Sequence, residues 1–251
     1  MDTLVIQVDK LCTPPVFTGL GNVKWLKLVD TLLSPRFLTG ILDACPQLES
    51  FILSYSVRES FRSIFDHATT PKTLPQVLSV RQETLRYLEI YGMPGPIDDS
   101  GIEIVGSLKG LTNLETLILV GSGFRFGKSE DKKTVETCLA DLLPPSIRSV
   151  SIDSDYMSII HGPIIALGEA VKQGSFPMLK EVRCYHWLYE HLEASVLEKI
   201  SGSSITPEEL EDFWESSSCR PLSRLSRTCN VSFSGTNKRL FERDAGRLER
   251  S

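Results

Sequence analysis

The residues Gly127-Lys128-Ser129 match the end of a phosphate-binding loop and are the clearest candidates for chemistry in this sequence. Such a loop follows the pattern G-x-x-x-x-G-K-[ST], because glycine lets backbone amides surround the phosphate groups while the lysine reaches the terminal ones. Here Ser122 stands where the first glycine belongs, and a charged run, residues 128–133, occupies the place where the helix of such a loop begins. A nucleotide-binding protein that uses Lys128 is therefore kept as one alternative.

Other reactive side chains lack the spacing that catalysis or metal binding needs. Asp153 and Asp155 end an expected strand, but no third ligand lies near them in the sequence. Cys184 and His186, with His191 beyond, carry zinc-ligating atoms without zinc-site spacing, and Cys184 falls on an expected core position. Neither a G-x-S-x-G elbow nor an H-E-x-x-H helix occurs. We therefore expect a non-enzymatic protein with no cofactor and no metal site.

The composition is that of an ordinary globular protein, with 251 residues, 41% hydrophobic and 24% charged. No window approaches the roughly 18 apolar residues of a membrane helix. The acidic start of the chain lacks the basic region of a secretory signal. Six cysteines without a CxxC pair do not suggest a disulfide framework. We therefore expect a cytoplasmic or nuclear protein that does not bind membranes.

Positive charge is concentrated at the C-terminal end of the chain. Residues 218–251 contain eight Lys or Arg residues against three Asp or Glu residues, whereas the rest of the chain contains 19 against 29. A basic tail can bind an acidic partner, but this tail has no block of four consecutive basic residues. We therefore expect a solvated charged tail and no nucleic-acid binding.

A leucine pattern, L-x-x-L-x-L with other apolar residues allowed, recurs along the chain at intervals of 25, 37, 29, 33 and 32 residues. Six matches at such regular spacing indicate an internal repeat. Each match ends in the alternation typical of a strand. The matches are Val23-Leu26-Leu28, Leu48-Phe51-Leu53, Leu85-Leu88-Ile90, Leu114-Leu117-Leu119, Ile147-Val150-Ile152 and Leu179-Val182-Cys184.

Helical patterns lie between the matches. Ser34 is an expected N-cap followed by Pro35 at the first helical position. Residues 100–108 begin with a capping box, residues 133–143 stop before two prolines, and Gly174 ends a helix over residues 164–173. Strand and helix in alternation imply parallel strands. Because one unit cannot bury its apolar face alone, stacked units should form an α/β arc with strands inside and helices outside.

The segments "ILDACPQLESFIL" (41–53) and "PIDDSGIEIVGSLKGLTNLETLIL" (96–119) resemble the longer leucine-rich repeats of F-box-type substrate receptors. The resemblance covers roughly residues 20–190. It implies a ribonuclease-inhibitor-like leucine-rich-repeat solenoid, an open horseshoe that binds other proteins. In the alternative that this chain is the substrate-recognition part of such a receptor, ubiquitin-ligase components would be among its partners.

The chain departs from that family in two respects. An Asn or Cys usually follows the last strand leucine by three residues, and the corresponding positions here predict a patchy side-chain ladder and an irregular arc. An F-box should precede the repeats, but strand-like sequence begins at Leu4, so we expect a chain without an F-box. The positions in place of Asn or Cys are Thr31, Ser56, Met93, Ser122, Asp155 and Trp187.

Three regions are expected: a leucine-rich-repeat arc over residues 1–190, a helical C-terminal cap over 191–235, and a charged tail over 236–251. Within the cap, residues 230–235 have the pattern of a final edge strand. The main functional prediction is a non-enzymatic module that binds another protein, of unknown identity, on the concave strand face.

Side chains between the core positions of each strand should point to that concave face. Trp, Tyr and Arg dominate interface energetics because they bury large areas with few rotors. The predicted contact residues are therefore Trp25, Tyr87, Tyr91, Arg183 and Tyr185. The full predicted face comprises Trp25, Lys27, Val29, Ser50, Ile52, Ser54, Tyr87, Glu89, Tyr91, Thr116, Ile118, Val120, Ser149, Ser151, Asp153, Glu181, Arg183 and Tyr185.

Overall fold

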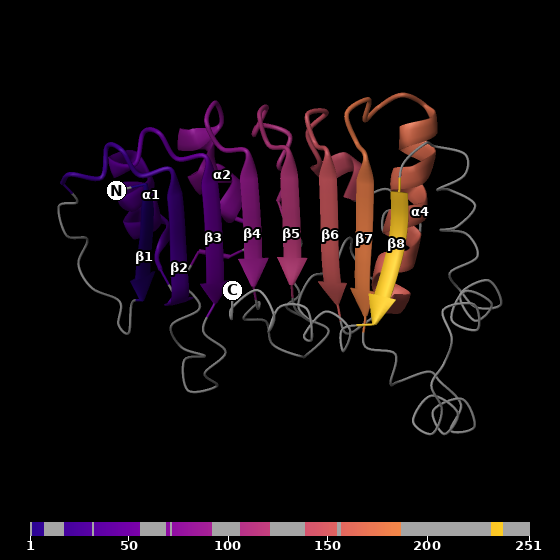
Figure 1. Ribbon diagram of the computed structural model, residues 1–251, viewed down its shortest axis with the longest axis horizontal. Helices are drawn as coiled ribbons and strands as arrows, with labels where there is room; N and C mark the ends of the chain where they lie inside the picture. Colours follow the sequence, from indigo (N-terminus) through magenta and orange to yellow (C-terminus); the bar gives the residue numbers. More distant parts are fainter. Residues whose placement is uncertain are drawn as a thin grey trace, which may run out of the picture.

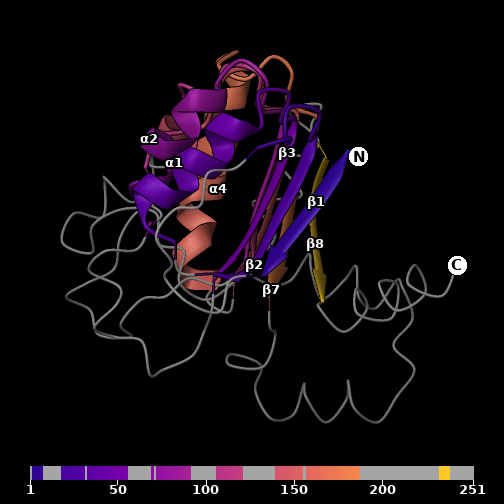
Figure 2. The same ribbon diagram turned by 90° about the vertical axis from the view of Figure 1, so that its left-hand side faces the viewer.

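The computed structural model describes residues 2–7, 18–31, 33–55, 69–70, 72–91, 106–120, 139–154, 157–186 and 232–237. These residues form one eight-stranded sheet in which each strand lies parallel to the next in chain order (Figure 1). Figure 2 shows the described helices on one face of this sheet. The architecture is therefore α/β, as the alternating patterns predicted. The strands are β1 Thr3–Gln7, β2 Trp25–Thr31, β3 Ser50–Tyr55, β4 Tyr87–Tyr91, β5 Thr116–Val120, β6 Ser149–Ser154, β7 Glu181–His186 and β8 Ser232–Asn237.

The six sequence matches align with one another across the sheet. Their middle residues form one row from Leu26 to Val182, and their last residues form a second row two positions further on. Residues of the middle row are at most 1% exposed. Burying a leucine or valine contributes about 1.5–3 kcal/mol, so these rows provide the continuous core beneath the helices. The middle row is Leu26, Phe51, Leu88, Leu117, Val150 and Val182.

A turn precedes each of these strands and adds a further apolar position. In five of the six units, the first residue of the match donates its N–H to a carbonyl three residues earlier, at 3.0–3.2 Å. Four of these five turn residues are buried and Leu20 is partly buried. The turn therefore extends the core at the edge where the strands begin. The accepting residues are Leu20, Cys45, Leu111, Pro144 and Phe176.

The residue before each strand forms what we term the strand-start ladder. At every step from β1 to β7, the carbonyl oxygen of this residue accepts two N–H groups from the next strand, at 2.7–3.3 Å. Lys24 and Trp25, for example, both donate to Asp2. The same pattern at six successive steps holds the strands in register. The ladder residues are Asp2, Lys24, Glu49, Arg86, Glu115, Arg148 and Lys180.

Helix α1, Pro35–Ala44, follows β2 as the sequence predicted. The Ser34 hydroxyl accepts the N–H of Phe37 at 3.3 Å, and Pro35 takes the first helical position. A residue distant in the sequence caps the C-terminal end of α1: the Arg81 guanidinium donates to the carbonyls of Leu42 and Asp43 at 2.9 and 3.2 Å. Arg81 ends the 3₁₀ helix η2, Ser79–Arg81, which continues the short helix α2, Leu74–Leu78.

Helix α4, Met157–Lys172, ends on the glycine that the sequence predicted as a stop. Gly174 has a φ of +81°, where a side chain would be strained. Its N–H donates to Val171 and the N–H of Ser175 donates to Ala170, at 2.9 and 3.0 Å, which is a Schellman motif. Residues 139–142 are also helical and stop before Pro144, as predicted.

The last described strand, β8, confirms the edge strand expected near residues 230–235. It pairs with β7 and runs to Asn237, so Thr236 and Asn237 belong to the sheet rather than to the charged tail predicted from residue 236. The capping box at residues 100–103, the rest of the predicted cap and the rest of the tail lie outside the described residues.

The helix-side packing leaves no room for a side chain at Gly106. A Cβ atom there would lie 2.6 Å from the carbonyl oxygen of Lys72 and 3.0 Å from Cγ of Pro75. A Cβ at Gly110, four residues later, would meet nothing within 4 Å. The two glycines therefore form a matched pair for testing this contact.

We expect Gly106→Ala to lower the free energy of unfolding by about 1–3 kcal/mol, because the backbone of residue 72 must move to admit the methyl group. Gly110→Ala should change it by less than about 0.5 kcal/mol. Urea denaturation followed by circular dichroism measures both. Equal stability of the two variants would show that residues 72 and 106 are not packed as described.

Candidate functional site

The face of the sheet opposite the helices, here called the open face, carries the side chains that the sequence predicted for a binding surface. Its first row runs Trp25, Ser50, Tyr87, Thr116, Ser149 and Glu181, each paired with the next. The second row runs from Lys27 to Arg183 in the same way. In the third row, β2–β3 pairing is irregular between Leu28 and Thr31, and regular pairing resumes from Ser54 to Tyr185. The predicted positions therefore share one face.

Two of the predicted contact residues stack on each other although a strand lies between them. The rings of Trp25 on β2 and Tyr87 on β4 have centroids 5.7 Å apart and planes 28° apart. Ser50 on β3 pairs with both residues and is 6% exposed. Its short side chain leaves space for the rings to meet above it. Trp25 remains 45% exposed, so this stack is accessible to a partner.

A carboxylate on the same strand holds the two tyrosines of β4. The Tyr87 hydroxyl donates to Oε2 of Glu89, and Tyr91 also hydrogen-bonds to the Glu89 side chain. Glu89 is only 7% exposed, whereas Tyr91 is 36% exposed. Alternate side chains of a strand point to one face, so the sequence Tyr-x-Glu-x-Tyr places the acceptor between its two donors. We call Trp25, Tyr87 and Tyr91 the aromatic patch.

The surroundings of Tyr87 and Tyr91 raise the pKa of both phenols. Burial raises the pKa of Tyr87 well above the usual value for tyrosine, and the hydrogen bond to Glu89 and the negative charge of that group raise it further. The pKa of Tyr91 is raised by the same causes in the same order, with a further contribution from the charge of Asp153. Both phenols therefore remain protonated hydrogen-bond donors at neutral pH.

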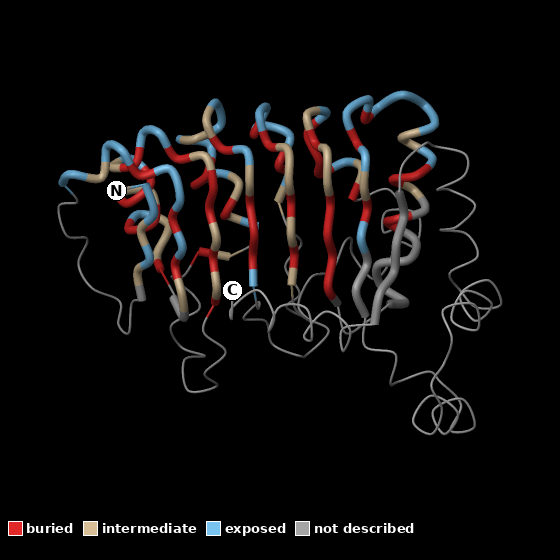
Figure 3. The backbone as a smooth tube through the Cα atoms, viewed as in Figure 1, coloured by how far each residue is buried: buried red, intermediate tan, exposed pale blue. Residues whose placement is uncertain are grey.

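The centre of the open face is more buried than the solvated face of an alternating sheet would be. Glu89, Ser151 and Asp153 are between 7% and 9% exposed, although all three project away from the core rows. Figure 3 accordingly shows β4 and β6 as largely buried along their lengths. The open face thus has a largely buried polar centre, formed by Glu89 on β4 and by Ser151 and Asp153 on β6, and it is bordered on the β2 side by the aromatic patch.

Arg183, another predicted contact residue, does not join the aromatic patch. Arg183 lies on β7, three strands from β4, which corresponds to roughly 14 Å at the usual strand spacing. Its Nε atom forms an ion pair with Oε1 of Glu181 at 2.7 Å. The backbone of Tyr185 pairs with Asp153, and the structure does not describe its side chain. Arg183 therefore belongs to a separate polar region of the same face.

Sequence reasoning placed Glu89 and Ser50 on this face but did not select them as functional residues. Glu89 fixes the tyrosines and Ser50 lets the rings stack. The role of Glu89 could have been found from the spacing Tyr87-x-Glu89-x-Tyr91, which puts a carboxylate two residues from each phenol. The role of Ser50 depends on how closely the rings of Trp25 and Tyr87 approach across β3, which the repeat pattern does not give.

Most residues of the other candidate chemistry lie outside the described residues. Gly127, Lys128 and Ser129 lie outside them, as do Asp155 and His191. Within the described part of the chain, no group of three His, Cys, Asp or Glu side chains could hold a metal ion. Among the helices of that part, none has the length and apolar character to cross a membrane.

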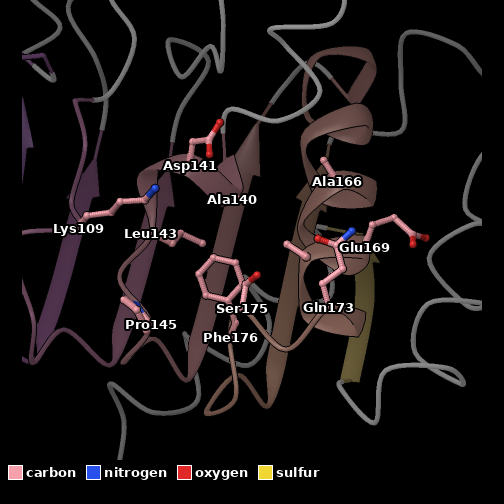
Figure 4. Close-up of a pocket in the computed structure, with 11 residues that line it drawn as sticks. Lys109, Ala140, Asp141, Leu143, Pro145, Ala166, Glu169, Gln173, Ser175 and Phe176 are labelled. Atoms are coloured by element: carbon pink, nitrogen blue, oxygen red, sulfur yellow. The ribbon is translucent and has the colours of Figure 1, made fainter.

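A groove of about 640 Å³ lies on the helix side of the sheet, away from the open face. Figure 4 shows Phe176 and Leu143 at its centre, with Lys109 and Asp141 on one side and Glu169 and Gln173 on the other. It runs between the 139–145 segment and α4. The groove has an apolar floor and charged margins, and it contains none of the predicted contact residues.

We expect Glu89→Gln to lower the pKa of Tyr87 and Tyr91 toward about 10, while burial keeps both above that value. When the pKa of a phenol is higher in the folded state than in the unfolded state, its protonated form contributes to stability. This contribution is complete below the unfolded-state pKa and is lost as the pH rises through the folded-state pKa. The variant should therefore lose less stability than wild type between pH 9 and pH 12.

Absorbance at 295 nm would follow tyrosine ionisation, with Tyr87→Phe and Tyr91→Phe assigning the two late transitions. Urea denaturation at each pH would follow stability. Glu83→Gln, at an exposed carboxylate before β4, is the matched control and should leave both transitions unchanged. Unchanged transitions in Glu89→Gln would rule out the hydrogen bonds described.

No protein-family model matches this sequence, and no curated protein matches it significantly. The likeness to repeats of F-box-type receptors consequently stays a prediction that rests on the residues quoted for it. Function has to be inferred from the open face itself and the residues that shape it.

Proposed function

We propose that this protein is a non-enzymatic interaction module, an irregular leucine-rich-repeat solenoid that binds a partner protein on its open face. The repeat assignment is supported by parallel strands in chain order, by buried rows of motif residues and by the recurring turn and carbonyl pattern at each strand start. One unit of this kind cannot bury its apolar face alone, which favours a solenoid.

The aromatic patch is the observation that carries the proposed function. Trp25 and Tyr91 are two of the large apolar or aromatic side chains that stay exposed among the described residues. Trp and Tyr are enriched among interface hot spots. The stack with Trp25 and the bonds to Glu89 hold Tyr87 and Tyr91 in place. Side chains that are already ordered lose little entropy on binding, so the aromatic patch is preorganised to bind a partner.

The partner's footprint should extend beyond the patch. A stable interface covers about 800 Å² per partner, which is enough to reach from β2 across β4 and β6 to Arg183 and Tyr185. The polar side chains of β4 and β6 would contribute specificity, because a partner that buries them without matching their charge and hydrogen-bonding groups loses binding energy. If this chain is the substrate-recognition part of an F-box-type ubiquitin-ligase receptor, the substrate would bind this same face and ligase components would be additional partners.

Affinity purification of the tagged chain from its native cells, followed by mass spectrometry, tests the proposal. Tyr87→Ala/Tyr91→Ala should lose a specific protein that wild type retains. With that protein purified, we expect the variant to bind at least about 30-fold more weakly, as for hot-spot residues. Recovery of ubiquitin-ligase subunits with wild type would favour the receptor alternative.

Val80→Ala/Met178→Ala is the matched control. The exposed fractions of Val80 and Met178, 36% and 41%, are similar to those of Tyr91 and Trp25. Val80 lies in η2 and Met178 in the turn before β7, so neither belongs to the open face. This variant should retain the partner. If the control weakens binding as strongly as the tyrosine variant, or if the tyrosine variant binds like wild type, the binding site lies elsewhere.

A further inference from the structure

The outer edge of β1 carries backbone groups with which no described strand pairs. The N–H of Trp25 donates to the carbonyl of Asp2 at 2.9 Å, and Thr3 is the register partner of Trp25. In a parallel ladder the bonding direction alternates along a strand. The N–H and C=O groups of Thr3, Val5 and Gln7 therefore point away from β2, toward the side that faces the viewer in Figure 2.

The core is also incomplete at this edge. Leu4 and Ile6 continue the two core rows, yet both are only partly buried, whereas their register partners Leu26 and Leu28 are 1% and 0% exposed. Val5 is 59% exposed. The strand contains no Lys or Pro to discourage pairing, which edge strands commonly have. An added strand would cover Leu4 and Ile6 and satisfy the outward backbone groups.

The strand-start ladder indicates which charge the added strand should carry. The sign alternates over the first six ladder residues, from Asp2 through Lys24, Glu49, Arg86 and Glu115 to Arg148, and the last ladder residue, Lys180, repeats the sign of Arg148. Glu115 shows that one carboxylate can serve both neighbours, because it lies 3.8 Å from Arg86 and 3.4 Å from Arg148. Asp2 occupies the equivalent position in β1. By the same pattern, the strand outside Asp2 should begin with a basic residue.

We propose that the β1 edge binds an extended segment of a partner protein as a ninth, parallel strand with the pattern basic-x-apolar-x-apolar. The carbonyl of the basic residue accepts the N–H groups of Asp2 and Thr3, and its side chain lies beside the Asp2 carboxylate. The two apolar residues pack on Leu4 and Ile6. This surface is separate from the aromatic patch, so the same protein could hold one partner at two places.

Peptide binding to the full-length chain tests this assignment. The probe is the fluorescein-labelled peptide VKWLKLVD, which has the required pattern and reproduces residues 23–30, and its control is VEWLKLVD. Fluorescence anisotropy should show VKWLKLVD binding about tenfold more tightly than the control, since an attractive charge pair replaces a repulsive one. Asp2→Lys should reverse this preference.

Val5→Pro tests the backbone bonds. Its missing N–H faces the outer edge, where proline is tolerated, so the β1–β2 ladder remains and peptide binding should fall at least tenfold. Circular dichroism checks the fold, and Val5→Lys, which keeps the N–H, provides a second variant that should bind more weakly than wild type. In amide exchange followed by NMR, the peptide should protect Thr3, Val5 and Gln7. Tyr87→Ala/Tyr91→Ala should bind the peptide like wild type.

Three results would overturn the proposal. The first is no binding of either peptide at millimolar concentration. The second is binding that Tyr87→Ala/Tyr91→Ala abolishes and Val5→Pro does not, which would place the peptide on the aromatic patch. The third is a dimer in analytical ultracentrifugation that Val5→Pro dissociates, which would identify a second copy of this chain as the occupant of the edge.

Discussion

At the start of each strand, one carbonyl oxygen accepts two N–H groups from the following strand, and this bond pair repeats from Asp2 to Arg148. A shift of one residue at any step would turn the buried rows toward solvent. The side-chain ion pairs along the ladder are exposed and individually contribute at most about 1 kcal/mol. Their alternating signs instead disfavour wrong pairings, while the backbone bonds and the apolar rows provide the stability.

The aromatic patch is a consequence of that register. Because Trp25, Ser50 and Tyr87 are paired side by side, a small residue lies between two large ones. The rings can then stack across β3 at 5.7 Å. The register also leaves Glu89 between Tyr87 and Tyr91, where burial of a carboxylate is compensated by hydrogen bonds from the phenols. The same constraint that builds the core therefore shapes the open face.

The two faces of the sheet differ in how they are stabilised. The helix side depends on close packing and on long-range bonds, such as Arg81 closing α1 and Gly106 lying against the backbone of residue 72. The open face instead presents aromatic and polar side chains that stack on or hydrogen-bond to one another. The β1 edge is a third surface, where no further strand among the described residues continues the core rows or the backbone ladder.

Local sequence patterns predicted the positions of β2 to β7, the rows that face the core, the start of α1 and the C-terminal end of α4. These features follow from local rules, namely the two-residue period of strands, the Ser34 cap and the Gly174 stop. The tertiary structure alone decided that Trp25 stacks on Tyr87, that Glu89 is buried, and that Arg183 lies apart from the patch. Each depends on how closely side chains of different strands approach and which partners they take, which the repeat spacing along the chain does not specify.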